Sequence, residues 1–236
     1  MNKLSKNKIS DFQVSVILPI YNEAAGITET IKTINQKVSK LTSTYEIIAV
    51  NDGSSDNSLK ILIDLQKKLP LKIIVHQTNR GYGAAFKSGI KHAKYPWVFF
   101  TDADLQFNID ELENFIPYTV DKDLIIGYRK DRADVFRRKL VSHIYNQIIQ
   151  VLFGLKIKDV DCAFKLIRKS ALSNIKLRSN SFFVSAELMI KVHQQKLLIK
   201  EIGVNHYPRT KGNSTVTPKR MLFSIIDLIS LYLSIL

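Results

Sequence analysis

The chain has 236 residues, 45% of them hydrophobic and 24% charged, a balance typical of a globular domain and not of a disordered chain. Its 35 lysines and arginines outnumber 21 acidic residues, giving a formal net charge of +14. That charge indicates an anionic partner: nucleic acid, an anionic membrane surface or phosphorylated small molecules. A single cysteine, Cys162, excludes an intrachain disulfide and fits a reducing compartment.

The chain begins with a basic stretch and continues as alternating apolar and amphipathic segments. Met1–Lys8 lacks an apolar run, so residues 1–12 are predicted to be a flexible tail without a secretory signal. Buried parallel strands are predicted at Val14–Ile20, Glu46–Val50, Lys72–His76, Trp97–Thr101 and Leu124–Gly127. Helical periodicity occupies Ala24–Ser39, Asp56–Lys68, Gly83–Ala93 and Ile109–Val120. This alternation predicts an α/β fold with a mostly parallel, doubly wound sheet.

The pattern changes after Gly127. The segments expected there are a charged loop Arg129–Arg138, a helix Arg138–Gly154, a polar-to-apolar segment Asp159–Ile167, a helix Phe182–Gln195, a strand Leu197–Val204 and a loop His206–Pro218. The predicted main domain therefore spans residues 13–218.

Residues 219–236 are predicted to form a C-terminal amphipathic helix. The apolar stretch Met221–Leu236 is shorter than the roughly 20 residues that a membrane span needs. Its polar residues recur at steps of three and four, at Ser224, Asp227, Ser230 and Ser234. With Lys219 and Arg220 beside it, this pattern favours a helix lying in a membrane interface. A terminal helix packed on the domain and the start of a membrane anchor are the alternatives.

Polar residues follow four consecutive predicted strands. They are Tyr21-Asn22-Glu23, Asn51-Asp52-Gly53-Ser54, Thr78-Asn79-Arg80-Gly81 and Asp102-Ala103-Asp104. Any one group is explained by a turn or a helix cap, but four successive strand ends are not. Ligands of open α/β sheets bind beyond the carboxyl ends of the strands, so this edge is predicted to hold the functional site.

Asp102 and Asp104 are the strongest chemical signal. In an extended segment alternate side chains point the same way, so both carboxylates are expected to face one hard cation. Mg²⁺ bound in this way keeps coordination positions for diphosphate oxygens. Such a cation neutralises the charge that develops on a departing nucleoside diphosphate.

Several motifs together resemble the family 2 glycosyltransferases with the GT-A fold. They are Val16-Ile-Leu-Pro-Ile-Tyr-Asn-Glu23, Val50-Asn-Asp-Gly-Ser-Ser-Asp56, Asn79-Arg-Gly-Tyr-Gly83 and Asp102-Ala-Asp-Leu-Gln106, and the similarity covers roughly residues 13 to 215. The nearest branch is that of dolichol-phosphate mannose synthases and bactoprenol glycosyltransferases. The Gln-X-X-Arg-Trp signature of processive synthases is absent, which favours transfer of a single sugar.

The resemblance implies roles for matching positions. The donor would be bound by Pro19, Tyr21, Glu23, Asp52, Asp102 and Ala103, with Asp52 reading the base. Mg²⁺ or Mn²⁺ would be ligated by Asp102, Asp104 and Gln106. The acceptor phosphate would be bound by Arg129, Arg138, Ser142, Arg209 and Lys211, since guanidinium groups match phosphate oxygens. The residues expected to act in transfer are Asp104, Asp161 and Arg129.

The acceptor decides the expected mechanism. A polyprenyl (dolichyl or undecaprenyl) phosphate is already ionised near neutral pH, so it needs no strong base, and in-line attack would invert the anomeric carbon. A hydroxyl acceptor would need a base, for which Asp161 and Glu187 are the candidates. The resemblance implies a GDP- or UDP-hexose donor of the mannose or glucose type, and peripheral association with the cytoplasmic face of a membrane.

Two other classes fit the sequence less well. Gly81-Tyr-Gly-Ala-Ala-Phe86 imitates a dinucleotide-binding loop, but Phe86 occupies a position where close packing needs a small residue. A nucleic-acid-binding protein would explain the net charge, but not acidic residues at strand ends, and no nucleic-acid motif is present. No nucleic-acid partner is therefore expected. The chain departs from the family pattern at Asn51, Tyr128 and Cys162–Lys165, which leaves the sugar and base undefined.

Overall fold

A computed structural model describes residues 11–130, 136–212, 227–229 and 231 of the chain, with the backbone alone for residues 136–143. The predicted tail at residues 1–12 and the predicted helix at residues 219–236 lie largely outside the described residues.

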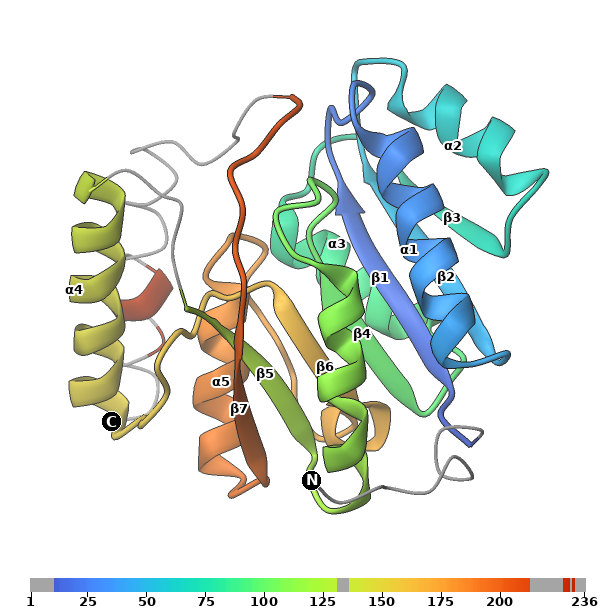
Figure 1. The fold of residues 1–236 in the computed structure, drawn as a ribbon. Helices are drawn as coiled ribbons and strands as arrows, with labels where there is room; N and C mark the ends of the chain where they lie inside the picture. Colours follow the sequence, from blue (N-terminus) through green and yellow to red (C-terminus); the bar gives the residue numbers. More distant parts are fainter. Residues whose placement is uncertain (1–10, 131–135, 213–226, 230, 232–236) are drawn as a thin grey trace.

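A seven-stranded sheet runs through the molecule in the order β3-β2-β1-β4-β6-β5-β7 (Figure 1). Its strands are β1 (Val14–Ile20), β2 (Tyr45–Asp52), β3 (Leu71–His76), β4 (Trp97–Thr101), β5 (Leu124–Arg129), β6 (Phe164–Arg168) and β7 (Ile199–Val204). Neighbouring strands are parallel except for β6, which is antiparallel to both β4 and β5. The mostly parallel α/β sheet expected from the sequence is thus confirmed, and β6 is a strand that the sequence pattern indicated only as a polar-to-apolar segment.

The α-helices labelled in Figure 1 connect and cover the strands. They are α1 (Ile27–Leu41), α2 (Ser58–Gln66), α3 (Tyr82–His92), α4 (Phe136–Phe153) and α5 (Val184–Gln194). In α1 the buried residues recur at helical spacing, at Ile27, Thr30, Ile31, Ile34 and Val38, which gives the helix one apolar face.

The prediction of one α-helix over Ile109–Val120 is wrong. Two 3₁₀ helices, η2 (Ile109–Asn114) and η3 (Ile116–Val120), occupy that stretch. Pro117 lies in the first turn of η3 and has no N–H to donate, so a continuous α-helical ladder cannot pass through it. A third short 3₁₀ helix, η4 (Lys169–Leu172), follows β6.

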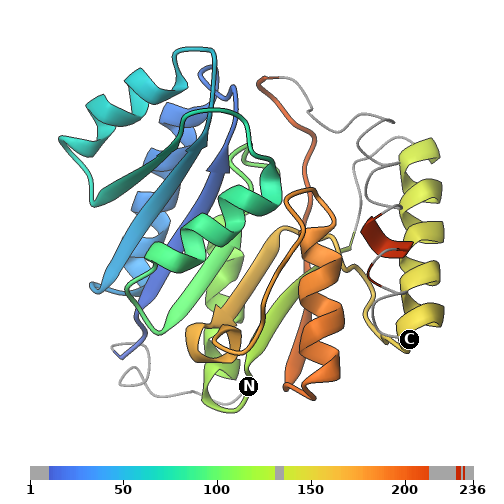
Figure 2. The ribbon, with the colours of Figure 1, turned by 180° about the vertical axis from the view of Figure 1, so that it is seen from behind.

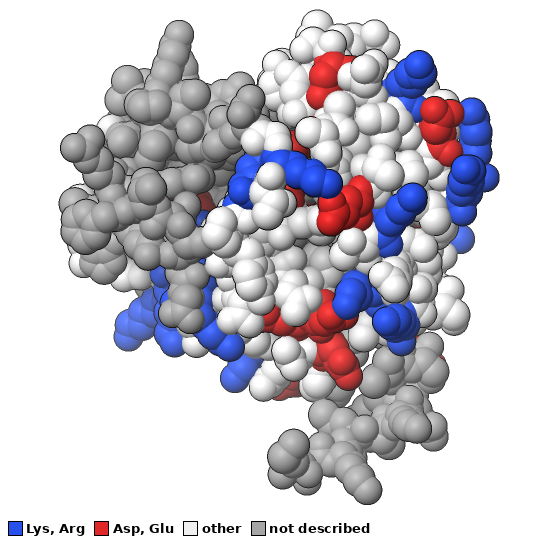
Figure 3. All heavy atoms as spheres, turned by 45° about the horizontal axis from the view of Figure 1, so that its top comes forward, with Lys and Arg blue, Asp and Glu red and all other residues white. Residues whose placement is uncertain are grey.

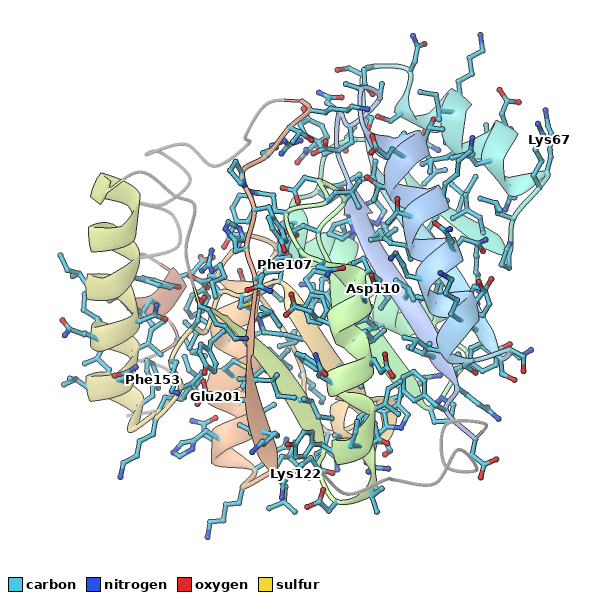
Figure 4. All side chains as sticks on the ribbon, in the orientation of Figure 1. Lys67, Phe107, Asp110, Lys122, Phe153 and Glu201 are labelled. Carbon is cyan, nitrogen blue, oxygen red and sulfur yellow. The ribbon has the colours of Figure 1, made fainter. Side chains whose placement is uncertain are left out.

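The helices lie on both faces of the sheet. In Figure 1 α1 and η2 are in front of the strands, and Lys37 of α1 pairs with Asp110 of η2, which Figure 4 labels. The view from behind in Figure 2 shows α3 and α5 on the opposite face. The core between these layers is built from fully buried strand residues such as Ile17, Phe99 and Phe164. The sheet is therefore covered on both sides and leaves its carboxyl edge for the loops.

Four residues of the predicted C-terminal helix are described, and they are helical at Asp227–Ile229 and Leu231. Leu228 is 2% exposed, and Asp227 accepts hydrogen bonds from Ser179 and Ser181 in the loop before α5. Within these few residues the helix packs on the domain, which was the alternative to a membrane-interface position. In the stretches that the structure describes, no helix combines the length and apolarity of a membrane span.

Candidate active site

The candidate site lies where the strand order reverses, between β1 and β4. These strands are parallel, with Val14 opposite Trp97 and Ile17 opposite Phe100, so the residues that follow them emerge side by side. The Thr30 hydroxyl of α1 donates to the backbone oxygen of Ala103 over 2.8 Å, which fixes the turn between the two aspartates. Crevices at such switch points are the usual ligand sites of open α/β sheets.

Asp102 and Asp104 lie together at this edge of the sheet, close enough for the charge of Asp104 to affect Asp102. The Tyr82 hydroxyl donates to Oδ1 of Asp102 over 2.8 Å. Burial, and next the charge of Asp104, raise the pKa of Asp102 to about 7, although the Tyr82 bond acts in the opposite direction. Asp104 accepts the backbone N–H of Gln106 over 3.2 Å, and Leu105 between them has a φ of 56°. Two carboxylates held this close disfavour each other's ionised form.

This carboxylate pair fits a divalent cation. Carboxylate oxygens suit Mg²⁺ and Mn²⁺, and a Mg²⁺ site commonly uses one or two carboxylates while substrate phosphates supply further ligands. Within the described ranges no group of three or more His, Cys, Asp or Glu residues is arranged to hold a metal ion. The Gln106 amide nitrogen donates to the Tyr207 backbone oxygen over 2.9 Å, which leaves its Oε1 as the atom that would serve as a ligand.

The segment after β7 crosses the crevice and brings two cations to it. Arg209 pairs with Glu23, and its Nη1 lies 3.7 Å from Oδ2 of Asp104. Lys211 instead pairs with Glu29 of α1 at 2.6 Å, where both side chains are half exposed. Figure 3 views this edge of the sheet, with basic and acidic side chains next to one another. Arg209 therefore joins the residues that follow β1 and β4.

Hydrogen bonds hold this segment against the Asp104 loop. The backbone N–H of Tyr207 donates to the Gln106 oxygen over 2.8 Å, and Phe107 forms an antiparallel bridge with His206. The ring centroids of Phe107 and His206 are 5.2 Å apart, and Phe107 is labelled in Figure 4 beside this segment. The position of Arg209 is thus set by β7 and by the loop that carries the two aspartates.

Asp52, expected to read the base, is 3% exposed and has several donors around it. Its oxygens accept the backbone N–H groups of Arg80 and Gly81 over 3.0 and 2.8 Å. The His76 ring bonds Asp52 over 2.6 Å through Nδ1 and the Ser88 hydroxyl over 2.8 Å through Nε2. Ser88, His76 and Asp52 are connected as in a Ser-His-Asp triad. Because Asp52 also accepts two backbone amides, we assign these bonds to holding the Asp52 turn against the residues that precede α3.

Arg129, expected to bind phosphate, lies in a buried ion pair. Its Nε and Nη2 contact Asp159 at 2.6 and 2.7 Å, and the two side chains are 11% and 7% exposed. Sequence reasoning did not identify Asp159. Burial would lower the pKa of Arg129, but the bonds from Asp159 outweigh it and raise that pKa. The pair is bidentate, the strongest geometry between these groups.

Asp161 lies close to Tyr82, which contacts Asp102, and to Arg129, which pairs with Asp159. Its negative charge acts to raise the pKa of Tyr82, Arg129, Tyr145 and Lys165. The Lys165 residue is 1% exposed. Burial lowers the pKa of Lys165, while the charges of Asp161 and Asp159 act against that change. Lys165 is a further buried cation that was not assigned a role, although it lies in the Cys162–Lys165 stretch where the sequence departs from the family.

Glu187, the other candidate base, has its carboxylate engaged in the protein. The backbone N–H groups of Arg178 and Ser179 donate to it over 2.8 to 3.0 Å, and Lys191 pairs with it at 2.5 Å. Its side chain is 2% exposed. A structural role for Glu187 accounts for all these contacts. Of the two candidate bases, Asp161 is the one that lies near the carboxylate pair and Tyr82.

The remaining predicted residues fall into two groups. Pro19 lies on β1 opposite Val50, and Tyr21 follows β1 half-buried at the crevice. Arg138 and Ser142 lie in α4, within the stretch described by its backbone alone, so their expected phosphate contacts are outside the described residues.

Known proteins resemble this chain along most of its length. The undecaprenyl-phosphate 4-deoxy-4-formamido-L-arabinose transferase of Salmonella choleraesuis is 28% identical over 221 residues, covering 92% of this chain and 67% of that protein. The dodecaprenyl-phosphate galacturonate synthase of Rhizobium johnstonii is 28% identical over 235 residues, covering 96% and 68%.

The fold also has solved counterparts. Glucosyl-3-phosphoglycerate synthase from Mycobacterium tuberculosis, in complex with Mn²⁺, UDP and phosphoglyceric acid, matches with a TM-score of 0.75 at 16% identity, over 96% of this chain and 81% of that chain. Residues 15–176, more than half of the chain, match the family model described as Glycosyl transferase family 2. The chain is thus a glycosyltransferase that belongs to glycosyl transferase family 2.

Proposed function

We propose that this glycosyltransferase moves one sugar from a nucleotide-sugar donor to a polyprenyl phosphate, with a divalent cation bound at Asp102 and Asp104. The observation that carries the proposal is the partly buried carboxylate pair of Asp102 and Asp104 at the switch point between β1 and β4, next to Arg209. Because burial and the neighbouring charge disfavour the ionised form of Asp102, a bound cation would lower the electrostatic free energy of the pair. The relatives named above for undecaprenyl- and dodecaprenyl-phosphate support the choice of acceptor.

The residues divide the work between donor and acceptor. Asp102 and Asp104 would hold Mg²⁺ or Mn²⁺, which when bound supplies positive charge for the departing nucleoside diphosphate. Arg209, already within 3.7 Å of Asp104, would add its guanidinium to the same phosphates. Asp52, fixed by the amides before α3, would receive the base.

A lipid phosphate needs little activation by the protein. Phosphate monoesters lose their second proton with a pKa of about 6, so the attacking oxygen is already ionised at neutral pH. The new bond forms between that oxygen and the anomeric carbon while the bond to the diphosphate breaks, with inversion. The chain's task is then to align the two substrates. Peripheral binding to the cytoplasmic face of a membrane would bring the site to its lipid.

The sugar is a prediction from the sequence alone. Mannose and glucose were expected, whereas the relatives' names carry an arabinose derivative and galacturonate, so these names do not support a hexose of that type. A panel of GDP- and UDP-sugars is therefore the appropriate donor set.

The test is transfer of label from radiolabelled nucleotide sugars to a polyprenyl phosphate, with Mn²⁺ or Mg²⁺ or with EDTA. The expected result is label in the organic phase that needs the metal and is lost in Asp104→Ala. Asp64→Ala is the matched control, because Asp64 lies on the exposed side of α2 and pairs with Lys67, labelled in Figure 4. Transfer only to hydroxyl acceptors would overturn the lipid-phosphate acceptor and make Asp161 the base to test.

A further inference from the structure

Tyr82 contacts the carboxylate pair from an element that carries no other part of it. It is the first residue of α3, and its hydroxyl reaches Oδ1 of Asp102, 20 positions further along the chain, over 2.8 Å. A phenol and a carboxylate at this distance form a charge-assisted hydrogen bond when the carboxylate is ionised. With one oxygen bonded in this way, the Asp102 side chain cannot rotate without breaking the bond.

The ring of Tyr82 is held between two other aromatic rings. Phe100 of β4 meets it edge-on, with centroids 5.6 Å apart and an interplanar angle of 81°. Phe182, from the loop before α5, lies on another side at 5.0 Å and 33°. Aromatic pairs in this range are stabilising, and together they restrict the direction of the phenol oxygen.

The backbone on either side of Tyr82 is equally restricted. Gly81 has a φ of +99°, and an added Cβ there would lie 2.3 Å from the Asn180 oxygen. At Gly83 an added Cβ would lie 2.5 Å from the Ser179 oxygen, and its N–H donates to the Asn180 oxygen over 2.9 Å. Both glycines are required for the start of α3 to lie against the 179–181 loop.

That loop is itself fixed from two directions. The buried Glu187 of α5 accepts the backbone N–H groups of Arg178 and Ser179. Asp227, near the C-terminus, accepts the hydroxyls of Ser179 and Ser181 over 3.0 and 2.6 Å. A continuous set of hydrogen bonds and close packing therefore runs from Asp227 through the loop to Tyr82 and Asp102.

We infer that Tyr82 is a positioning residue, which holds the Asp102 carboxylate in the orientation that binds the cation together with Asp104. The inference rests on the proposed metal-dependent function and assigns a role in it to a side chain that contacts the Asp102 carboxylate. Groups that orient a metal ligand typically contribute 10–100-fold to metal affinity. The 179–181 loop and Asp227 act indirectly, because they hold Tyr82, which in turn holds Asp102.

The experiment compares Mn²⁺ binding by Tyr82→Phe and wild type, with Mn²⁺ alone as the probe and free Mn²⁺ followed by electron paramagnetic resonance. It is done at a single mildly alkaline pH, so that protonation of the carboxylates does not enter. Tyr82→Phe keeps the ring and its contacts and removes only the hydroxyl. We expect the Kd for Mn²⁺ to rise about tenfold. The metal concentration for half-maximal transfer should rise in parallel, with most of kcat recovered at saturating metal.

Tyr45→Phe is the matched control. Its hydroxyl donates to Asn35 over 2.8 Å, at the opposite end of the sheet from the crevice, so the same chemical change should leave the Kd unchanged. Thermal unfolding in EDTA checks that both variants fold. If Tyr82→Phe does not fold, Ser181→Ala takes its place, with a smaller rise in Kd expected because it loosens the loop against Asp227.

Two results would overturn the inference in different ways. A Kd for Tyr82→Phe equal to that of wild type, in a protein whose Asp104→Ala variant does lose Mn²⁺, would remove the role of Tyr82 and leave the proposed function intact. Wild-type protein that binds no Mn²⁺, or an Asp104→Ala variant that binds it as wild type does, would overturn the metal site itself and the inference with it.

Discussion

The carboxylates at the carboxyl edge of the sheet have different partners on its two sides. On the β5 side Asp159 is 7% exposed in its side chain and receives two short bonds from Arg129. On the β4 side Asp102 and Asp104 lie next to each other, and Nη1 of Arg209 lies 3.7 Å from Oδ2 of Asp104. Burial and the neighbouring charge keep the pKa of Asp102 near 7.

This difference separates a structural ion pair from a ligand site. A buried pair with good geometry satisfies itself and leaves little for a ligand to gain. The partly buried pair of Asp102 and Asp104 instead has an unfavourable electrostatic free energy, which a bound cation would lower. The four predictions below test this contrast, in order of expected effect.

Asp104→Ala is expected to have the largest effect, on activity. Loss of one carboxylate from the pair removes a ligand of the cation that would stabilise the leaving diphosphate, a contribution of several kcal/mol. We expect kcat/KM for sugar transfer to fall about a thousandfold. Steady-state kinetics at several Mn²⁺ concentrations measures it, and activity within tenfold of wild type at all of them would contradict the ligand role.

Asp159→Ala is expected to act on stability. Removing one partner leaves the buried Arg129 guanidinium uncompensated, and breaking such a pair costs about 3 kcal/mol or more. Urea unfolding of the metal-free protein should show the loss. Asp64→Ala provides the comparison, because its pair with Lys67 is more than half exposed and should contribute little to the free energy of unfolding. Equal losses in the two variants would refute the distinction.

Asp102→Asn should stabilise the metal-free protein at neutral pH. In the folded state the Asp102 pKa is near 7 against an ordinary value of 3.8, so the folded protein holds a proton that the unfolded chain has released. Wild-type stability from this group therefore falls as pH rises from about 4 to about 7. Removing the charge should raise the free energy of unfolding above that window and change it little below the window.

The measurement for Asp102→Asn is urea unfolding across this pH range, with and without Mn²⁺. Added Mn²⁺ should stabilise wild type and not the variant, because only wild type retains both carboxylates. A variant less stable than wild type at neutral pH without metal would show that Asp102 is compensated in some other way.

Lys211→Ala should have the smallest effect on stability. Its pair with Glu29 is half exposed on both sides, and such surface pairs contribute less than about 1 kcal/mol. If Lys211 binds the acceptor phosphate as the sequence suggests, KM for the lipid should rise while unfolding stays unchanged. An unchanged KM would leave Lys211 with only its surface pair.

Much of the fold followed from local patterns. The six predicted strands match β1 to β5 and β7 within a few residues at either end. Buried parallel strands such as β1 and β4 are recognisable because they give continuous apolar runs with polar residues at their ends. β6 was indicated only as a polar-to-apolar segment, since its direction depends on neighbours distant in sequence. The 3₁₀ pair at Ile109–Val120 was missed although Pro117 was visible, because its apolar spacing suits either helix.

Within the site, the sequence by itself determined which chemical groups are available. Two aspartates separated by one residue after an apolar strand offer two carboxylates that can face one cation. Tertiary structure alone decided which partners those groups have. Tyr82 meets Asp102, Arg129 meets Asp159 and Glu187 meets the backbone of Ser179, pairs that are 20, 30 and 8 residues apart. A residue's type fixes its charge and hydrogen-bonding capacity, whereas its burial and its partners depend on how distant segments pack.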